Sequence, residues 1–287
     1  MRKTLQASLV AALGLVLASA AYGYTGTYTP GAGINLTPHD LAQSGNGMSG
    51  FNAVPTDTHA RICIFCHAPH NAYKLSPANG GPAIGVGGGV TAPDAYDYLP
   101  LWNHTLPAPT VYTMYWSGPG QPASGPTAQQ TLNNQSLGSG SLLCLSCHDG
   151  SVAVNSYGNG SQPTTSQSSG TTTIGAGYVI GKDGILQNHH PVGFSYGMVV
   201  AGEAGGGVGG TGGIRPATET MGTAGTIGSH LYASQALGVN DAVECGTCHS
   251  VHNTGNTGEA LLWRSDANSQ LCLTCHAKGT NPGTTTP

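Results

Sequence analysis

Apolar residues in this chain gather in short runs and do not repeat at a helical or strand period over long stretches. The first run, 9–17, follows Arg2 and Lys3 and precedes a series of small residues. That order predicts a signal peptide covering residues 1–23. The run is short for a membrane span, and no later stretch approaches the required length. We therefore expect a secreted mature chain, 24–287, without a transmembrane segment, located outside the cell or on its outer surface.

The next apolar runs surround four cysteine-containing segments, and each segment is predicted to form a short helix. Their sequences are THARICIFCHAPH, SLLCLSCHDG, DAVECGTCHSVH and SDANSQLCLTCH. Small polar residues before these runs are typical N-caps, and Gly or Pro after them typically ends a helix. The predicted boundaries are Pro69 at the end of the first helix, N-caps at Ser141, Asp241 and Ser265 or Asp266, and a stop at Gly150.

The segments between these helices are rich in Gly, Ser, Thr and Pro, which predicts loops at 78–95, 155–177 and 202–213. Residues 171–180 (TTTIGAGYVI) are the exception, because their β-branched content favours a strand. None of these segments has an apolar pattern able to build its own core. We therefore predict one domain, 24–287, that is mostly irregular, with short helices and little sheet.

All eight cysteines of the chain lie in the pattern Cys-x-x-Cys-His, which occurs four times. This pattern is the attachment site of c-type haem: the two thiols bond to the porphyrin edge and the histidine becomes the proximal ligand of the iron. We therefore predict four covalently bound haems and a role in electron movement. The residues are Cys63, Cys66 and His67; Cys144, Cys147 and His148; Cys245, Cys248 and His249; and Cys272, Cys275 and His276.

Three other interpretations of the cysteines explain less. A disulfide framework suits an exported protein with an even cysteine count, but it needs no histidine after every second cysteine. A zinc ribbon could use the last four cysteines and would leave His249 and His276 without a role. A thioredoxin-like pair needs one motif and an α/β pattern, which is missing from this sequence.

The composition limits both stability and partners. Only 7% of the residues are charged and 46 of 287 are glycine, a balance that favours disorder unless something else supplies a core. Four haems, each a large apolar plate, would supply such a core, so we predict a core organised around the haems. Without Arg2 and Lys3 the chain carries 6 basic and 12 acidic side chains, a formal net charge of −6. The absence of a basic face argues against a nucleic-acid partner.

Eight histidines remain outside the motifs, enough to give every iron a second axial ligand. His70 and His252 each lie three residues after a proximal histidine, on nearly the same helix face, so each is placed to reach an adjacent haem. His104 and His190 stand in apolar, proline-restrained settings. The favoured distal candidates are His39, His70, His104, His190 and His252, over His59, His189 and His230. For any one of them the alternative is an exposed or hydrogen-bonded histidine.

Short motifs flanking the cysteines occur in a distinctive order. They are PHDL (38–41), CIFCHAPHNA (63–72), PLWNH (100–104), LCLSCHDGSVAVNSYGN (143–159), NHHPVGF (188–194), CGTCHSVHNT (245–254), LWRSD (262–266) and LCLTCHAK (271–278). This order resembles the extracellular, nanowire-forming tetrahaem c-type cytochromes of metal-reducing bacteria. The resemblance implies a continuous stack of haems, bis-histidine ligation of every iron, and subunits polymerised end to end. It also implies that one histidine ligates a haem of the neighbouring subunit, and His39 or His70 could be that donor.

Together these observations predict an electron carrier, not an enzyme. Its partners would be identical subunits in an end-to-end polymer, other redox proteins, or extracellular acceptors such as metal oxides. One alternative is a monomeric periplasmic electron shuttle. Another is a multihaem oxidoreductase, which needs an iron with an open distal position.

Overall fold

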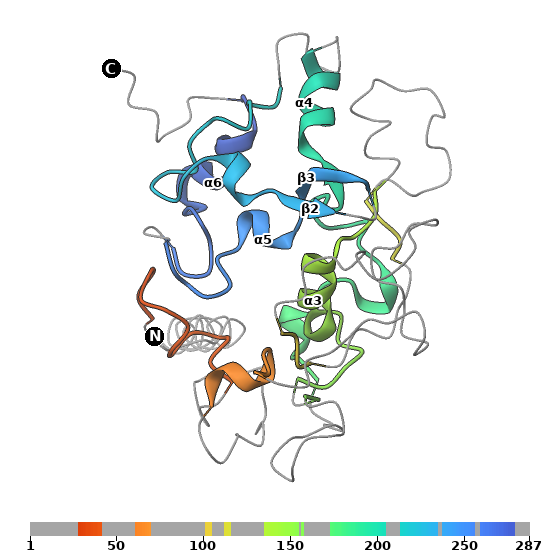
Figure 1. The fold of residues 1–287 in the computed structure, drawn as a ribbon, viewed down its shortest axis with the longest axis vertical. Helices are drawn as coiled ribbons and strands as arrows, with labels where there is room; N and C mark the ends of the chain where they lie inside the picture. Colours follow the sequence, from red (N-terminus) through yellow and green to blue (C-terminus); the bar gives the residue numbers. More distant parts are fainter. Residues whose placement is uncertain are drawn as a thin grey trace, which may run out of the picture.

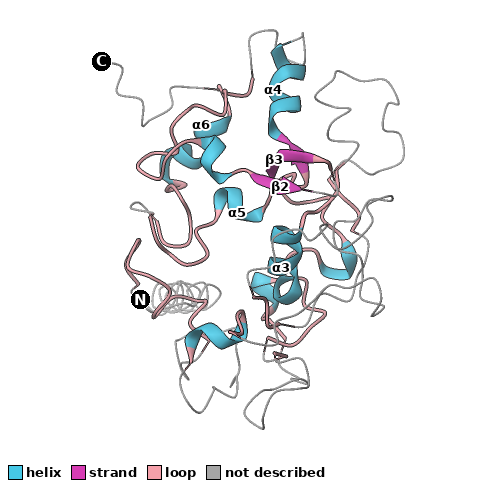
Figure 2. Cartoon of the chain, viewed as in Figure 1, coloured by secondary structure: helices cyan, strands magenta, loops and turns pink. Residues whose placement is uncertain are grey.

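The computed structural model describes ten stretches of the chain, and all four Cys-x-x-Cys-His motifs lie within them. The stretches are residues 28–41, 61–69, 101–104, 112–115, 135–154, 156–157, 173–204, 213–234, 237–255 and 259–278. The predicted signal peptide at 1–23 and the predicted loop at 78–95 lie outside the described residues. Within them, loops and turns connect short helices and one small sheet (Figure 2), in agreement with the predicted mostly irregular fold.

The described helices are short, and the longest of them is ten residues. The 3-10 helices are η1 (Ile62–Phe65), η3 (Ala176–Tyr178), η4 (Lys182–Gly184), η5 (Ile227–His230) and η6 (Ala267–Ser269); the α-helices are α3 (Ser139–His148), α4 (Tyr196–Ala204), α5 (Cys245–Cys248) and α6 (Gln270–Cys275). Each of η1, α3, α5 and α6 carries one cysteine motif. These four elements follow one another along the long axis of the molecule, in the order α6, α5, α3 and η1 from the top of Figure 1. No helix within the described residues is both long enough and apolar enough to cross a bilayer.

One three-stranded antiparallel sheet lies in the middle of the molecule (Figure 1). Its strands are β1 (Phe194–Ser195), β2 (Tyr232–Ser234) and β3 (Val239–Val243), in the order β1-β3-β2. β1 pairs with β3 through Phe194 opposite Val243, and β1 leads directly into α4. The central strand β3 ends one residue before α5, so the sheet fixes the start of the third cysteine motif.

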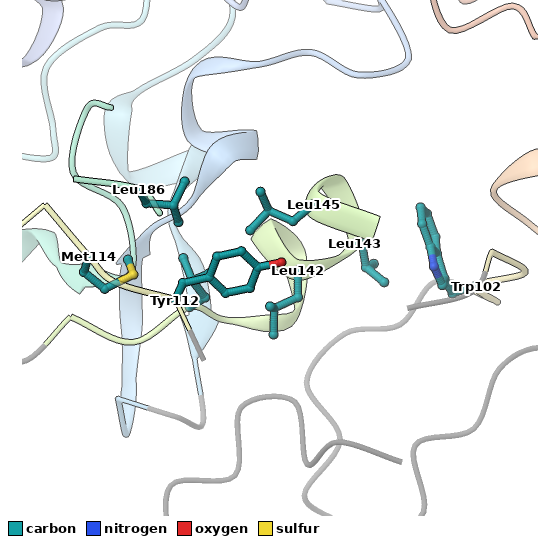
Figure 3. Close-up of a cluster of buried hydrophobic side chains, with 8 residues drawn as sticks. Trp102, Tyr112, Met114, Leu142, Leu143, Leu145 and Leu186 are labelled. Atoms are coloured by element: carbon teal, nitrogen blue, oxygen red, sulfur yellow. The ribbon is translucent and has the colours of Figure 1, made fainter. Parts of the chain in front are cut away.

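The buried apolar side chains form three clusters, and each one borders a cysteine motif. Cys66 packs against the first and third clusters, and Cys275 packs against the second. The first cluster (Figure 3) contains Trp102, Tyr112, Met114, Leu137, Leu142, Leu143, Leu145 and Leu186; the second contains Phe194, Tyr196, Val199, Ile227 and Val243; the third contains Phe65 and Tyr157. The apolar core is thus divided into small parts beside the motifs, as expected of a fold whose core is completed by its cofactors.

Several predicted boundaries are wrong. The N-cap of α3 is Gly138, not Ser141, whose hydroxyl lies inside the first turn and bonds Glu244 instead. Asp241 lies within β3, where its carboxylate accepts hydrogen bonds from the Gly197 amide and the Ser195 hydroxyl, so Glu244 is the N-cap of α5. In both cases a side chain with good capping chemistry found another partner within the tertiary structure.

Four other predictions concern the first, second and fourth motif helices and the segment 171–180. The stretch 173–180 contains the 3-10 helix η3 and no strand, so the strand prediction at 171–180 is wrong for its described part. The first motif helix ends at Phe65, four residues before the predicted Pro69. Gly150 follows the end of α3 with φ +74°, which confirms the predicted stop. The N-cap of α6, the helix of the fourth motif, is Ser269, not Ser265 or Asp266, because the separate 3-10 helix η6 follows Asp266 and ends at Ser269.

Gly193 joins the sheet to the segment that precedes α3. Its amide donates to the Val243 carbonyl at 2.7 Å and its carbonyl accepts from the Ser136 amide at 2.8 Å. Its φ is +72°, and a Cβ there would lie 2.6 Å from the Ser136 carbonyl oxygen. We expect Gly193→Ala to lower the free energy of unfolding by at least about 1–3 kcal/mol, measured by urea denaturation. Gly177→Ala is the control, since a Cβ at Gly177 meets nothing within 4 Å; equal stability of the two variants would contradict the expectation.

Candidate cofactor sites

The four cysteine motifs share one local backbone turn. In the first, third and fourth motifs, the histidine amide donates to the carbonyl of the first cysteine, at 2.8, 3.2 and 2.9 Å. In the second motif the equivalent residues lie within α3. Residues three apart on such a turn point to nearly the same side. The spacing therefore presents both thiols of a motif to one side of the turn, as attachment to a single porphyrin edge requires.

All eight thiols are available for attachment, because none of them forms a disulfide. Within the described residues no group of three His, Cys, Asp or Glu side chains is arranged to hold a metal ion. Burial raises the pKa of Cys66 to about 12, and burial with the nearby Cys275 raises that of Cys248 to about 12. A hydrogen bond between Cys144 and Cys245 lowers the pKa of Cys245 to about 7, which places two motifs in contact through their first cysteines.

Three motif histidines each face a second histidine ring. The centroids are 6.0 Å apart for His67 and His252, 6.2 Å for His148 and His39, and 6.2 Å for His276 and His190. Metal–nitrogen bonds to imidazole are about 2 Å, so two rings bound to opposite sides of one ion have centroids roughly 6 Å apart. Any angle between the planes is compatible with this, because both planes contain the shared axis.

Hydrogen bonds to backbone carbonyls orient four of the histidines in the same way. The Nδ1 atoms of His39, His148, His190 and His249 lie 2.9–3.3 Å from the carbonyl oxygens of Val251, Tyr178, Pro191 and Leu261. A carbonyl only accepts, so Nδ1 carries the proton and Nε2 keeps its lone pair. A metal-bound histidine is typically held in this way.

The ionisation of these histidines also suits metal binding, which requires neutral imidazole. Burial, with the nearby charge of His148, lowers the pKa of His39 to about 4. Burial likewise lowers the pKa values of His249 and His252. The donor set of thiols and neutral imidazoles therefore fits c-type haem.

His249 differs from the other three motif histidines. Within the described part of the chain, no second histidine ring faces it at a comparable distance, although its Nδ1 is held by Leu261 as in a ligand. His70, a favoured distal candidate, and His59 lie outside the described residues. His249 is therefore oriented like a metal ligand, but no second histidine ring lies opposite it among the described residues.

Among the described residues, no motif histidine ring lies opposite His104. Its ring is fully buried, and Nε2 lies 2.9 Å from the Ala153 carbonyl and 3.4 Å from the Cys147 sulfur. In this structure Nε2 therefore bonds a backbone acceptor, and His104 as a distal ligand stays a prediction.

The less favoured histidines also find other surroundings. His230 uses Nε2 for the Ala224 carbonyl at 2.6 Å and stacks on Trp263. His189 adjoins His190 in sequence, but only His190 faces a motif histidine ring.

A buried carboxylate joins the second motif to the third. Glu244 is 1% exposed, accepts from the Gly138 amide at 2.9 Å and accepts a short hydrogen bond from the Ser141 hydroxyl. Ser141 in turn accepts from the Cys245 amide at 3.1 Å. Glu244 was not among the predicted site residues, since a lone acidic residue before a motif resembles a solvated surface group. The only available signal was its place in a chain with very few charges.

A comparison with protein families matches residues 238–281 to the doubled CXXCH motif. That stretch holds β3, α5 and α6, and therefore the third and fourth motifs. No curated protein matches the chain. The CXXCH motifs indicate covalently bound c-type haem, and the match indicates a multihaem c-type cytochrome, a class of electron-transfer protein.

Proposed function

We propose that this chain is a tetrahaem electron conduit, in which each of the four motifs holds one haem. The arrangement of η1, α3, α5 and α6 supports this, because it spaces the attachment sites one after another along the long axis (Figure 1). When bound, each haem supplies one-electron exchange between ferric and ferrous iron. The protein contributes the spacing, the ligands and the local dielectric.

The proposal assigns distal ligands to three irons. His252 caps the iron of His67, His39 caps that of His148, and His190 caps that of His276. The three centroid separations of 6.0–6.2 Å carry this assignment. An iron sealed on both sides by imidazole exchanges electrons without binding a substrate, which favours a carrier over an enzyme.

The iron held by His249, in the third motif, would connect the conduit to a second copy of the chain. His39 faces His148 within one chain, which argues against it as the histidine that crosses between subunits. His70 would then be the histidine that crosses to the neighbouring subunit, where it would ligate the iron held by His249. Repetition of this contact would build an end-to-end filament outside the cell. Its electrons would pass to other redox proteins or to acceptors such as metal oxides.

Adjacent histidines allow a matched test of the ligand assignment. In His190→Ala the fourth iron loses its distal ligand, so one of the four haems should become high-spin and bind carbon monoxide when reduced. His189→Ala changes the neighbouring residue and should leave all four spectra unchanged. Absorption spectra of the reduced proteins with and without carbon monoxide provide the measurement. Carbon monoxide binding in both variants, or in neither, would contradict the assignment.

A second candidate, a multihaem oxidoreductase, is favoured by the same His249. If no neighbour caps its iron, that position is open to a small ligand. Carbon monoxide or nitrite binding to the unmodified secreted protein would support catalysis. A monomeric shuttle is separated from the filament by negative-stain microscopy, in which discrete particles support the shuttle and long fibres support the filament.

A further inference from the structure

Trp102 carries a buried hydrogen-bond donor that the polypeptide does not satisfy. The side chain is 8% exposed, and its Nε1 atom is shielded from solvent without an acceptor among the described residues. An unmet buried donor costs about 1–3 kcal/mol, and such groups are rare in folded proteins. The indole nitrogen only donates, so the missing partner is an acceptor.

The backbone on both sides of Trp102 is tied to the first cysteine motif. The Ala68 amide donates to the Leu101 carbonyl at 2.9 Å, and the Asn103 amide donates to the Cys66 carbonyl at 2.9 Å. Trp102 itself forms a β-bridge with His67. The indole stands edge-on to the His67 ring, with centroids 6.2 Å apart and planes at 89°. Any group held by the first motif is therefore a neighbour of this indole.

The other neighbours of Trp102 do not suit a water molecule. Its ring belongs to the first apolar cluster, where it lies across α3 from Tyr112, Met114 and Leu186 (Figure 3). Cys66 packs against the same cluster. The indole also lies beside the His67 and His104 rings, with centroids 6.2 and 6.5 Å away, so a buried water, which needs two to four polar partners, would find few of them among the described neighbours. A haem carries two propionate carboxylates, and a carboxylate is a strong acceptor for a single N–H group.

We propose that the Trp102 indole N–H donates a hydrogen bond to a propionate of the haem held by Cys63, Cys66 and His67. The inference rests on haem attachment at the first motif and is independent of distal ligand pairing and of filament formation. Trp102 thereby positions that haem and partly neutralises one of its carboxylates.

The test compares two tryptophans in the haem-loaded protein. Trp102→Phe removes the donor and keeps an aromatic ring. Trp263→Phe is the control, because the Trp263 indole already donates to the Gly246 carbonyl at 2.8 Å. In Trp102→Phe we expect a shift of one propionate bending band in the resonance Raman spectrum. We also expect a lower midpoint potential for one haem, since a less neutralised carboxylate stabilises ferric iron. Trp263→Phe should leave the propionate bands unchanged.

An unchanged propionate spectrum in Trp102→Phe would overturn the inference. A second variant identifies the haem: combining Trp102→Phe with Cys63→Ala and Cys66→Ala should abolish the Raman shift, and its persistence would assign the donor to another haem. The unmodified protein gives a further measurement if Trp102→Phe fails to load haem. With ¹⁵N-labelled tryptophan, one indole N–H resonance should move between the oxidised and reduced states. Identical positions in both states would overturn the inference.

Discussion

Replacing Cys245 and Cys248 together with alanine is expected to remove one haem from the mature protein and leave three. Two thioether bonds attach the third haem covalently. Without them only His249 would hold this haem, and it would hold it weakly. Because α5 lies between α6 and α3 (Figure 1), the loss should also interrupt electron passage between the fourth haem and the first two. Intact-mass spectrometry counts the haems, and stopped-flow reduction measures the exchange between those that remain.

The unmodified protein and Gly177→Ala are the controls for that experiment, and both should carry four haem masses. A mature chain with no added haem mass, or with free thiols at the motifs, would exclude the conduit altogether. Loss of one haem without any slowing of electron exchange would keep the haem assignment and reject the linear path.

Glu244→Leu is expected to destabilise the protein by several kcal/mol. The change leaves the Gly138 amide and the Ser141 hydroxyl buried without their acceptor, and each such group costs about 1–3 kcal/mol. It also separates α3 from α5, which share this carboxylate. Urea denaturation followed by circular dichroism measures the effect as a lower midpoint.

Glu244→Gln is the matched control, since it keeps the volume and one acceptor oxygen. It should lose only about 1 kcal/mol. If the leucine variant were as stable as the unmodified protein, the carboxylate would not be the element that joins the two motifs.

The attachment sites could be predicted from the sequence because their chemistry is local. Two thiols and an imidazole within five residues define a haem site, whatever the fold around it. The proximity of His252 to a motif was also readable, from its spacing after His249. The pairing of His39 with His148 and of His190 with His276 was not, because these contacts join segments about a hundred residues apart and no local pattern encodes them.

His104 shows why the remaining histidines could not be sorted from sequence. An apolar, proline-restrained setting suits an iron ligand and equally suits a buried histidine bonded to a carbonyl. In this structure the ring bonds the Ala153 carbonyl, a partner 49 residues away that no local pattern reveals. Ser141 and Asp241 failed as N-caps for a similar reason: their short polar side chains bond Glu244 and the Gly197 amide, partners that lie far away in sequence.

The three facing histidine pairs have a mechanical consequence for this glycine-rich chain. If iron joins them as proposed, residues 39 and 148, 67 and 252, and 190 and 276 would become the ends of three closed loops. The loops overlap in series, so no peptide bond between 39 and 276 lies outside all of them. Closing a loop of about a hundred residues removes roughly 4–5 kcal/mol of unfolded-state entropy in the chain-entropy model. The same irons that exchange electrons would then cross-link the chain. A break in the backbone at any single point within that span would leave the two fragments joined through an iron.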